Sequence, residues 1–154
     1  LMAEWRDEGD EQQYDPLLAA AAKSTIKSVI PVDAPEFHNP KSMRQAIRDH
    51  CRVHGMEIPQ TKGDITRVVL QSLAAKYAEA THALNAMLPT PIRKLHIIGG
   101  GSQNKLLNHL TQEALGIPVE AGPVEATAIG NILTQALAKG EVDDINEMRS
   151  VSVN

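Results

Sequence analysis

Three consecutive glycines, Gly99 to Gly101, form the part of this sequence best suited to chemistry. Leu95, Ile97 and Ile98 before them are typical of a short buried strand. Ser102 after them is a residue type that caps helices. Because glycine has no side chain, a ligand can approach such a turn closely, and the N-terminus of the following helix favours an anion. We expect this strand–turn–helix to bind a nucleotide phosphate, although a tight turn without a ligand would have the same sequence.

Two known phosphate-binding motifs do not fit this turn. A dinucleotide fingerprint that begins at Gly99 requires a third glycine at position 104, where the chain has Asn104. A P-loop that begins at Gly99 would place its lysine at Lys105. It would also require glycine at 104 and a hydroxyl residue at 106, where the chain has Leu106. If the turn binds a nucleotide, it therefore does so with a different architecture.

A second glycine segment, residues 122–131, follows a predicted strand over 117–121. Pro123 and Glu125 suit the first turn of a helix. Small residues then recur along this helix, at Ala126, Ala128 and Gly130. This pattern predicts a helix that packs closely against a neighbouring element. Close packing can be purely structural, but together with the first glycine segment it favours a nucleotide site.

The two segments together resemble the C-terminal region of FGGY carbohydrate kinases. The shared patterns are Gly-Gly-Gly-Ser-Gln-Asn-x-Leu-Leu-Asn over 99–108 and Gly-Pro-Val-Glu-Ala-Thr-Ala-x-Gly-Asn over 122–131. The similarity extends to Phe-His-Asn-Pro-Lys-Ser-Met over 37–43. It is strong from Thr66 to Asn131 and loose before Asp33.

This resemblance implies a fold and a domain organisation. The fold would be α/β, as part of an actin-like ATPase (ribonuclease H-like) domain, helix-rich with a short strand–helix–strand–helix C-terminal half. Residues 1–154 would be a fragment of the C-terminal kinase domain. Residues 1–60 would be a helical and irregular lead-in, and residues 61–140 a portion of the nucleotide-binding core.

The same resemblance implies an ATP-dependent kinase that phosphorylates a ketose, with ATP and Mg²⁺ as cofactors. Gly99, Gly100 and Gly101 would approach the α-phosphate and the ribose, and Gly100 would come closest. Gln103 and Asn104 would lie beside the adenine. The turn would therefore supply the adenosine side of the cleft.

The catalytic base of this family is an aspartate, which we expect upstream of this chain. Asp64, Asp143 and Asp144 are predicted at helix starts, and none of them matches the motif of the base. No metal ligand is assigned here either. The chain has no methionine at position 1 and ends without a polar tail, which also indicates a fragment. We expect the isolated chain to have no kinase activity.

Two alternatives remain open from the residues alone: a Rossmann-like domain for another nucleotide, and a helical interaction module without a ligand. The net charge of −4 argues against a nucleic-acid partner. No stretch approaches the roughly 20 apolar residues that span a bilayer, so we expect no membrane partner. The single cysteine, Cys51, fits a reducing cytoplasm.

Two other clusters contain residue types that bind metals. His50, Cys51 and His54 lie within about one helical turn, but no second cluster would complete the coordination of a metal. The acidic residues between Asp7 and Glu11 are typical of a solvated turn. We expect neither cluster to be a metal site.

Helices are predicted over residues 1–8, about 15–27, and Lys41 to His54. Prolines at 31, 35 and 40 indicate an irregular connection between the last two. A long amphipathic helix is predicted from a cap at Asp64 to about Leu88. Its predicted buried residues are Ile65, Val68, Val69, Leu73, Tyr77, Leu84 and Leu88. Gly116 and Gly140 are expected to end the two later helices.

Overall fold

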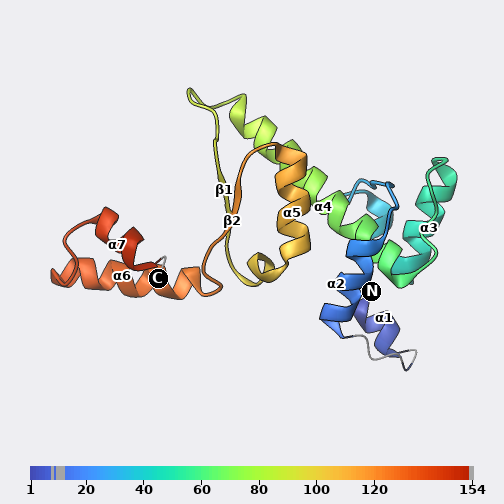
Figure 1. The fold of residues 1–154 in the computed structure, drawn as a ribbon, viewed down its shortest axis with the longest axis horizontal. Helices are drawn as coiled ribbons and strands as arrows, with labels where there is room; N and C mark the ends of the chain where they lie inside the picture. The colour runs from blue at the N-terminus through green and yellow to red at the C-terminus, as the bar shows by residue number, and fades with distance from the viewer. Residues whose placement is uncertain (8, 10–12, 153–154) are drawn as a thin grey trace. The chain divides into compact units, whose positions relative to one another are not determined.

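The computed structural model describes residues 1–7, 9 and 13–152, and the chain divides into two compact units between Pro89 and Thr90. The first unit contains α1 (Met2–Asp7), α2 (Tyr14–Lys23), the short 3₁₀ helix η1 (Pro35–Phe37), α3 (Met43–Val53) and α4 (Lys62–Asn85) (Figure 1). The second unit contains β1 (Leu95–Ile97), the 3₁₀ turn η2 (Gly100–Gln103), α5 (Lys105–Leu115), β2 (Val119–Ala121), α6 (Ala126–Lys139) and α7 (Ile145–Ser152).

The core of the first unit forms where α2 packs against α4. The two helices approach closely at Gly63, because a Cβ atom there would lie 3.0 Å from the Ala20 backbone carbon. The buried core is otherwise built mainly from aliphatic side chains. Its members are Trp5, Leu17, Ile26, Ile30, Phe37, Ile47, Cys51, Ile65 and Val68.

A capping box, and not a cap at Asp64, starts α4. The Thr61 hydroxyl accepts a hydrogen bond from the Asp64 backbone N–H at 3.0 Å. The Asp64 carboxylate accepts one from the Thr61 N–H, also at 3.0 Å. The predicted cap was therefore wrong by three residues, because an acidic residue in this box stands at the third helical position.

The predicted buried face of α4 is correct only in its first half. Ile65 and Val68 are buried, and Val69 and Leu73 are partly buried. Tyr77 is 38% exposed, and Leu84 and Leu88 are also exposed, so this part of the prediction was wrong. The buried positions of the second half are instead the small residues Ala74, Ala78 and Thr81, on an adjoining face.

The segment after Lys23 is extended, although a helix was predicted to about residue 27. Ile26, Ser28 and Ile30 are buried and alternate with exposed residues, as in a strand. The Ile30 N–H donates to the Ser72 hydroxyl at 2.9 Å, which holds the segment along α4. The helix therefore ends early because the chain pairs with polar groups of α4.

The other N-terminal helices are close to the predictions. α1 confirms the first helix as far as Asp7, and residue 8 lies outside the described residues. α3 begins at Met43, and the Ser42 hydroxyl caps it by accepting from the Gln45 N–H at 3.3 Å. Of the acidic stretch from Asp7 to Glu11, residues 8, 10 and 11 lie outside the described part of the chain.

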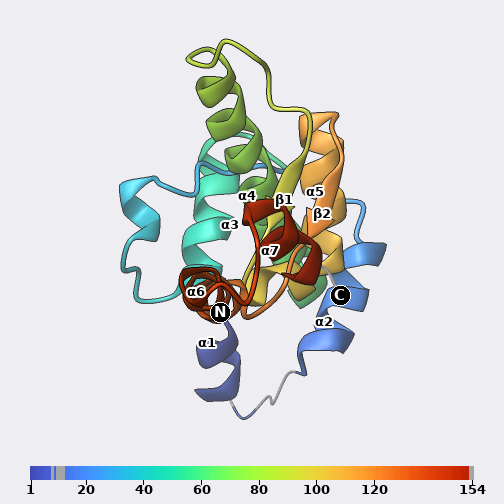
Figure 2. The same cartoon turned by 90° about the vertical axis from the view of Figure 1, so that its left-hand side faces the viewer.

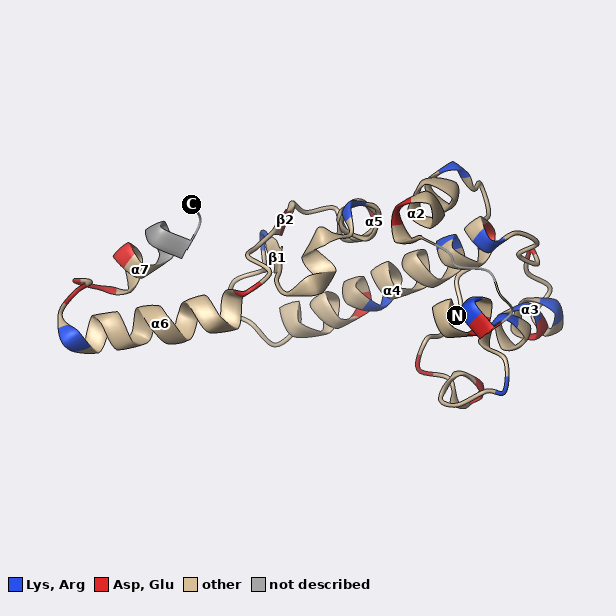
Figure 3. Cartoon of the chain, turned by 90° about the horizontal axis from the view of Figure 1, so that it is seen from below, with Lys and Arg blue, Asp and Glu red and all other residues tan. Residues whose placement is uncertain are grey.

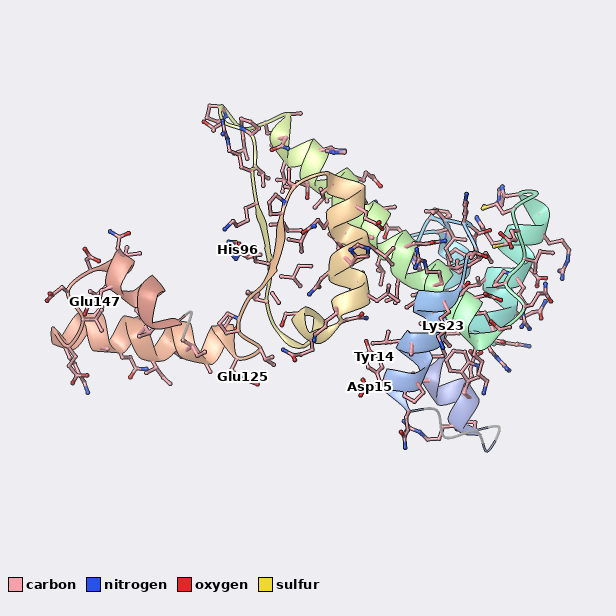
Figure 4. All side chains as sticks on the ribbon, in the orientation of Figure 1. Tyr14, Asp15, Lys23, His96, Glu125 and Glu147 are labelled. Carbon is pink, nitrogen blue, oxygen red and sulfur yellow. The ribbon has the colours of Figure 1, made fainter. Side chains whose placement is uncertain are left out.

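The second unit confirms the predicted strand–helix–strand–helix order. β1 and β2 are parallel, with Leu95 opposite Val119 and Ile97 opposite Ala121 (Figures 1 and 2). Both strands are shorter than predicted, and Ile98 lies beyond β1 with 58% of its surface exposed. α5 contacts β2, while the side chain of His96 lies on the opposite face of the pair (Figure 4).

The ends of α5 and α6 test the glycine predictions. Gly116 and Gly140 end these helices with φ of +67° and +74°, as predicted. α6 begins only at Ala126, so Pro123 lies before the helix and Glu125 at its N-cap position, not in its first turn. The helix start predicted at Asp143 and Asp144 is confirmed by α7, which begins at Ile145, although no range was predicted for this helix.

The close packing predicted for α6 is not found within the described part of the chain. A Cβ atom added at Gly130 would meet no atom there within 4 Å. α6 contains no charged residue before Lys139 (Figure 3). Among the described residues, no helix combines the length and apolar character needed to cross a membrane.

Candidate functional site

The two glycine segments lie side by side at the carboxyl ends of the paired strands. The Gly122 N–H donates to the Ile97 carbonyl at 2.8 Å, which continues the ladder beyond β2. The Gly99 N–H donates to the Pro123 carbonyl at 3.3 Å. Loops at the carboxyl ends of parallel strands are where α/β proteins bind ligands. The topology therefore brings together two segments that are more than twenty residues apart.

Gly122 lies so close to the end of β1 that a side chain there would require Ile98 to move. A Cβ atom at this position would lie 2.8 Å from the Ile98 side chain and 3.5 Å from the Ile97 carbonyl oxygen. The glycine thus permits the close approach of the two segments. Glu125, at the start of α6, is exposed (Figure 4).

The glycine turn has one strained position and a closed hydrogen-bonded form. Gly99 has φ +78° and ψ −168°, a conformation open essentially only to glycine. The Ser102 N–H and hydroxyl both donate to the Gly99 carbonyl, at 3.0 and 2.8 Å. These bonds fold residues 100–103 into η2.

The cap of α5 is Asn104, so the prediction of Ser102 as the cap was wrong. The Asn104 side-chain oxygen accepts from the Leu107 N–H at 3.0 Å, and Asn104 is only 3% exposed. Ser102 lies inside the preceding 3₁₀ turn and bonds back to Gly99. The extra turn displaces the helix start to Lys105.

Of the residues predicted to bind the nucleotide, four are at least partly exposed and one is buried. Gly100, Gly101 and Gln103 are exposed, and Gly99 is partly exposed. Cβ atoms added at Gly99, Gly100 or Gly101 would meet no described atom within 4 Å. Gly100 and Gly101 begin η2, so their N–H groups have no acceptor within the turn. Asn104 is turned inward as the helix cap.

Two groups at the turn were not predicted to belong to the site. The Asn108 side-chain amide donates to the Ser102 carbonyl at 2.9 Å. Pro123 contributes its carbonyl to Gly99. Asn108 belongs to the motif over 99–108, and its position one helical turn after Asn104 was the available signal. A backbone carbonyl such as that of Pro123 has no such signal, because its role follows from strand pairing.

The aspartates at predicted helix starts have structural partners. Hydrogen bonds from the Ser24 hydroxyl and the Thr61 backbone hold the pKa of Asp64 below its usual range. Bonds from the Glu147 and Asn146 N–H groups do the same for the pKa of Asp144. Both carboxylates therefore stabilise helix starts.

The cluster on α3 is also explained by packing. His50 Nδ1 lies 2.8 Å from a carboxylate oxygen of Glu36, and its ring lies 4.3 Å from that of His54, centroid to centroid. Cys51 is buried, and burial raises the pKa of its thiol. Within the described residues, no group of three His, Cys, Asp or Glu side chains could hold a metal ion.

A groove of about 350 Å³ in the first unit contains none of the predicted site residues. It lies between the extended segment after α2 and the middle of α4. Lys76, on its rim, pairs with Asp33 at 2.7 Å and with Glu79 at 3.2 Å. The charged side chains that line the groove are thus paired with one another.

Comparison with known proteins gives one family over nearly the whole chain. Residues 1–139 match the model of the FGGY family of carbohydrate kinases, C-terminal domain. The match covers both glycine segments.

Several curated rhamnulokinases are similar to this chain. That of Bacteroides thetaiotaomicron is 45% identical over 143 residues, which are 93% of this chain and 30% of the relative. That of Pectobacterium atrosepticum is 47% identical over 131 residues, 85% of this chain and 26% of the relative. That of Yersinia pestis is 38% identical over 149 residues, 94% of this chain and 31% of the relative. The chain thus spans less than a third of the length of these relatives.

Proposed function

Since this chain belongs to the FGGY family of carbohydrate kinases, we propose that it forms the adenosine side of the ATP site in a sugar kinase. The observation that carries the proposal is the open glycine turn. There the N–H groups of Gly100 and Gly101 have no acceptor among the described residues and lie beside a second glycine segment. The family match favours this function over a Rossmann-like domain or a helical module without a ligand.

The geometry suits a phosphate and ribose better than a larger apolar group. Three residues without Cβ atoms leave the backbone accessible, and backbone N–H groups bind phosphate oxygens well. The Gly99 N–H is already used by Pro123, so Gly100 and Gly101 would make the contacts. Gln103, exposed at the end of the turn, would lie beside the adenine. Asn104 would act there mainly by fixing the start of α5.

We propose Mg²⁺ as the second cofactor, bound mainly by groups other than this turn. Residues 99–104 contain no carboxylate, so the turn does not fit a magnesium site. In the whole enzyme the γ-phosphoryl group of ATP would pass to a hydroxyl of the ketose, whose proton an upstream aspartate would accept. The role of this chain is to hold the adenosine end of ATP.

On the same basis we propose the fold of the complete domain and its location in the cell. The parallel pair with α5 and α6 would belong to an actin-like ATPase domain, with residues 61–140 as part of its nucleotide-binding core. Residues 1–60 would support α4 as a lead-in. The enzyme would work in the cytoplasm, in keeping with a single buried cysteine.

The substrate that we propose is L-rhamnulose, phosphorylated to L-rhamnulose 1-phosphate. The support is the similarity to rhamnulokinases at 38% to 47% identity. No residue of this chain is assigned to the sugar, so the assignment depends on the relatives and not on the geometry of the turn.

Gly100→Val in the full-length kinase tests the nucleotide role. A Cβ atom there would meet no described atom within 4 Å, so we expect the variant to fold and its side chain to occupy space that the nucleotide needs. We expect the KM for ATP to rise at least about tenfold, or about 1.4 kcal/mol, with little change in the KM for the ketose. Ala138→Val, at an exposed position of α6, is the control. An unchanged KM for ATP in a folded Gly100→Val variant would remove the turn from the site.

A further inference from the structure

Two side chains, Ser102 and Asn108, hold the glycine turn by hydrogen bonds to its backbone carbonyls. We propose that they form a positioning clamp, which holds the N–H groups of Gly100 and Gly101 in the orientation that the nucleotide requires. This inference depends on the function proposed above, and it adds two residues that do not themselves touch the nucleotide.

Ser102 closes the turn on the side of β1. It is 2% exposed, and its N–H and its hydroxyl converge on the Gly99 carbonyl at 3.0 and 2.8 Å. Gly99 is the strained residue, with φ +78°. Ser102 therefore holds Gly99 in a backbone conformation that residues other than glycine would not adopt.

Asn108 attaches the turn to α5. Its side-chain amide donates to the Ser102 carbonyl at 2.9 Å, and its own N–H donates to the Asn104 carbonyl at 3.0 Å in the first helical turn. The two asparagines have different tasks, because Asn104 binds an N–H of its own helix whereas Asn108 reaches back to the turn. The three polar contacts of Ser102 thus connect η2 with Gly99, which precedes it, and with α5.

The stability of α5 alone does not explain an asparagine at 108. Asparagine is a poorer helix former than alanine in a helix interior. The Asn108 side-chain oxygen is also buried without a hydrogen-bond partner among the described residues, which is unfavourable. The hydrogen bond from Asn108 to Ser102 offsets both of these unfavourable contributions. Three adjacent glycines have unusual backbone freedom, so a ligand site built on them needs an external restraint.

The test is a kinetic comparison of Asn108→Ala and Ser102→Ala in the full-length kinase. Each variant removes one arm of the clamp and leaves Gly100 and Gly101 unchanged. We expect the KM for ATP to rise about threefold to tenfold in each, with the KM for the ketose unchanged. The thermal unfolding midpoint should fall by less than about 5 °C. A residue with a merely structural role would not change the KM for ATP alone.

Two further variants sharpen the comparison. Asn108→Asp keeps the size of the side chain but turns the donor into an acceptor that faces the Ser102 carbonyl, so it should raise the KM for ATP at least as much as alanine. His109→Ala, at the neighbouring exposed position of α5, should leave both KM values unchanged. If Asn108→Ala does not fold, Ser102→Ala and Asn108→Asp still decide the question.

The outcomes separate this inference from the proposed function. If Gly100→Val raises the KM for ATP but neither Asn108→Ala nor Ser102→Ala does, the clamp is refuted and the nucleotide site stands. If Gly100→Val has no effect either, the proposed site itself is wrong. An equal rise in the KM for ATP and for the ketose would also refute the clamp, because it would indicate a general loss of structure.

Discussion

At the scale of single residues, the three glycines of the turn have different requirements. Gly99 must be glycine because of its backbone, with φ +78° and ψ −168°. Gly101 has no positive φ, and no described atom lies within 4 Å of a Cβ atom added there; the same holds for Gly100. The described fold therefore does not require glycine at these two positions, whereas the nucleotide contact that we propose would.

This difference predicts that two alanine substitutions affect stability to different extents. Gly99→Ala should lower the free energy of unfolding by about 1–3 kcal/mol, because alanine is strained in this conformation. Gly101→Ala should change it by less than about 0.5 kcal/mol. Urea denaturation of the two variants measures both. Equal stability of the two would show that Gly99 is not held in the conformation described.

At the scale of elements, the sequence predicted most helices and both strands but not the details of their ends. Ser102 and Asp64 are residue types that cap helices, yet the caps are Asn104 and Thr61. α5 begins after the inward-facing side chain of Asn104, and α4 begins where Thr61 and Asp64 bond each other reciprocally. The alternation of Ile26, Ser28 and Ile30 was a period-two signal that the helix-forming alanines before it obscured. The contact of Asn108 with Ser102 depends on the 3₁₀ turn, which no periodicity reveals.

The capping box of α4 predicts a pH dependence. Hydrogen bonds from Ser24, at 2.5 Å, and from Thr61 lower the pKa of Asp64 in the folded chain. Because the pKa of Asp64 is lower in the folded chain than in the unfolded chain, its ionised carboxylate stabilises the fold at pH values above the unfolded pKa of about 3.9. This stabilisation is lost as the pH falls from about 3.9 through the folded pKa. Asp64→Asn should therefore cost about 1 kcal/mol at pH 7 and lose less stability than the wild type below pH ~4.

Unfolding free energies from pH 2 to pH 7 test this prediction. Asp15→Asn, at an exposed position in the first turn of α2, is the control. Parallel acid profiles for the wild type and Asp64→Asn would contradict the role given to this carboxylate.

The close contact of α2 with α4 predicts a contrast between two helical glycines. Gly63→Ala would place a Cβ atom 3.0 Å from the Ala20 backbone, so it should destabilise the chain by about 1–3 kcal/mol. Gly130→Ala, in α6, meets no described atom within 4 Å and should stabilise the helix by up to about 1 kcal/mol. Thermal unfolding of both variants measures the contrast. A stabilised Gly63→Ala variant would show that the helices are less closely packed.

At the scale of the whole molecule, the fold of the second unit is explained only in part by this chain. A two-stranded parallel sheet is small for a fold of this class, and parallel sheets are usually covered on both faces. His96 lies on the face opposite α5 and is 57% exposed on its side chain (Figure 4). The relatives are more than three times as long, so we propose that further elements of the full kinase cover this face and complete the nucleotide cleft.

The sugar was the least predictable part of the function. The glycine turn indicates a nucleotide by its chemistry, whereas no described residue has been given a contact with a ketose. The family could be inferred from the motifs over 99–108 and 122–131 and is confirmed by the match over residues 1–139. The substrate depends on the relatives alone.

We propose that this region belongs to an ATP-dependent kinase for L-rhamnulose, and ADP release by the full-length enzyme tests this proposal most directly. The enzyme is assayed with ATP, Mg²⁺ and, in turn, L-rhamnulose, L-fuculose, xylulose, ribulose and glycerol. We predict that kcat/KM is highest for L-rhamnulose. A higher kcat/KM for another of these compounds would contradict the substrate assignment, and the absence of ATP-dependent phosphorylation of all of them would contradict the kinase.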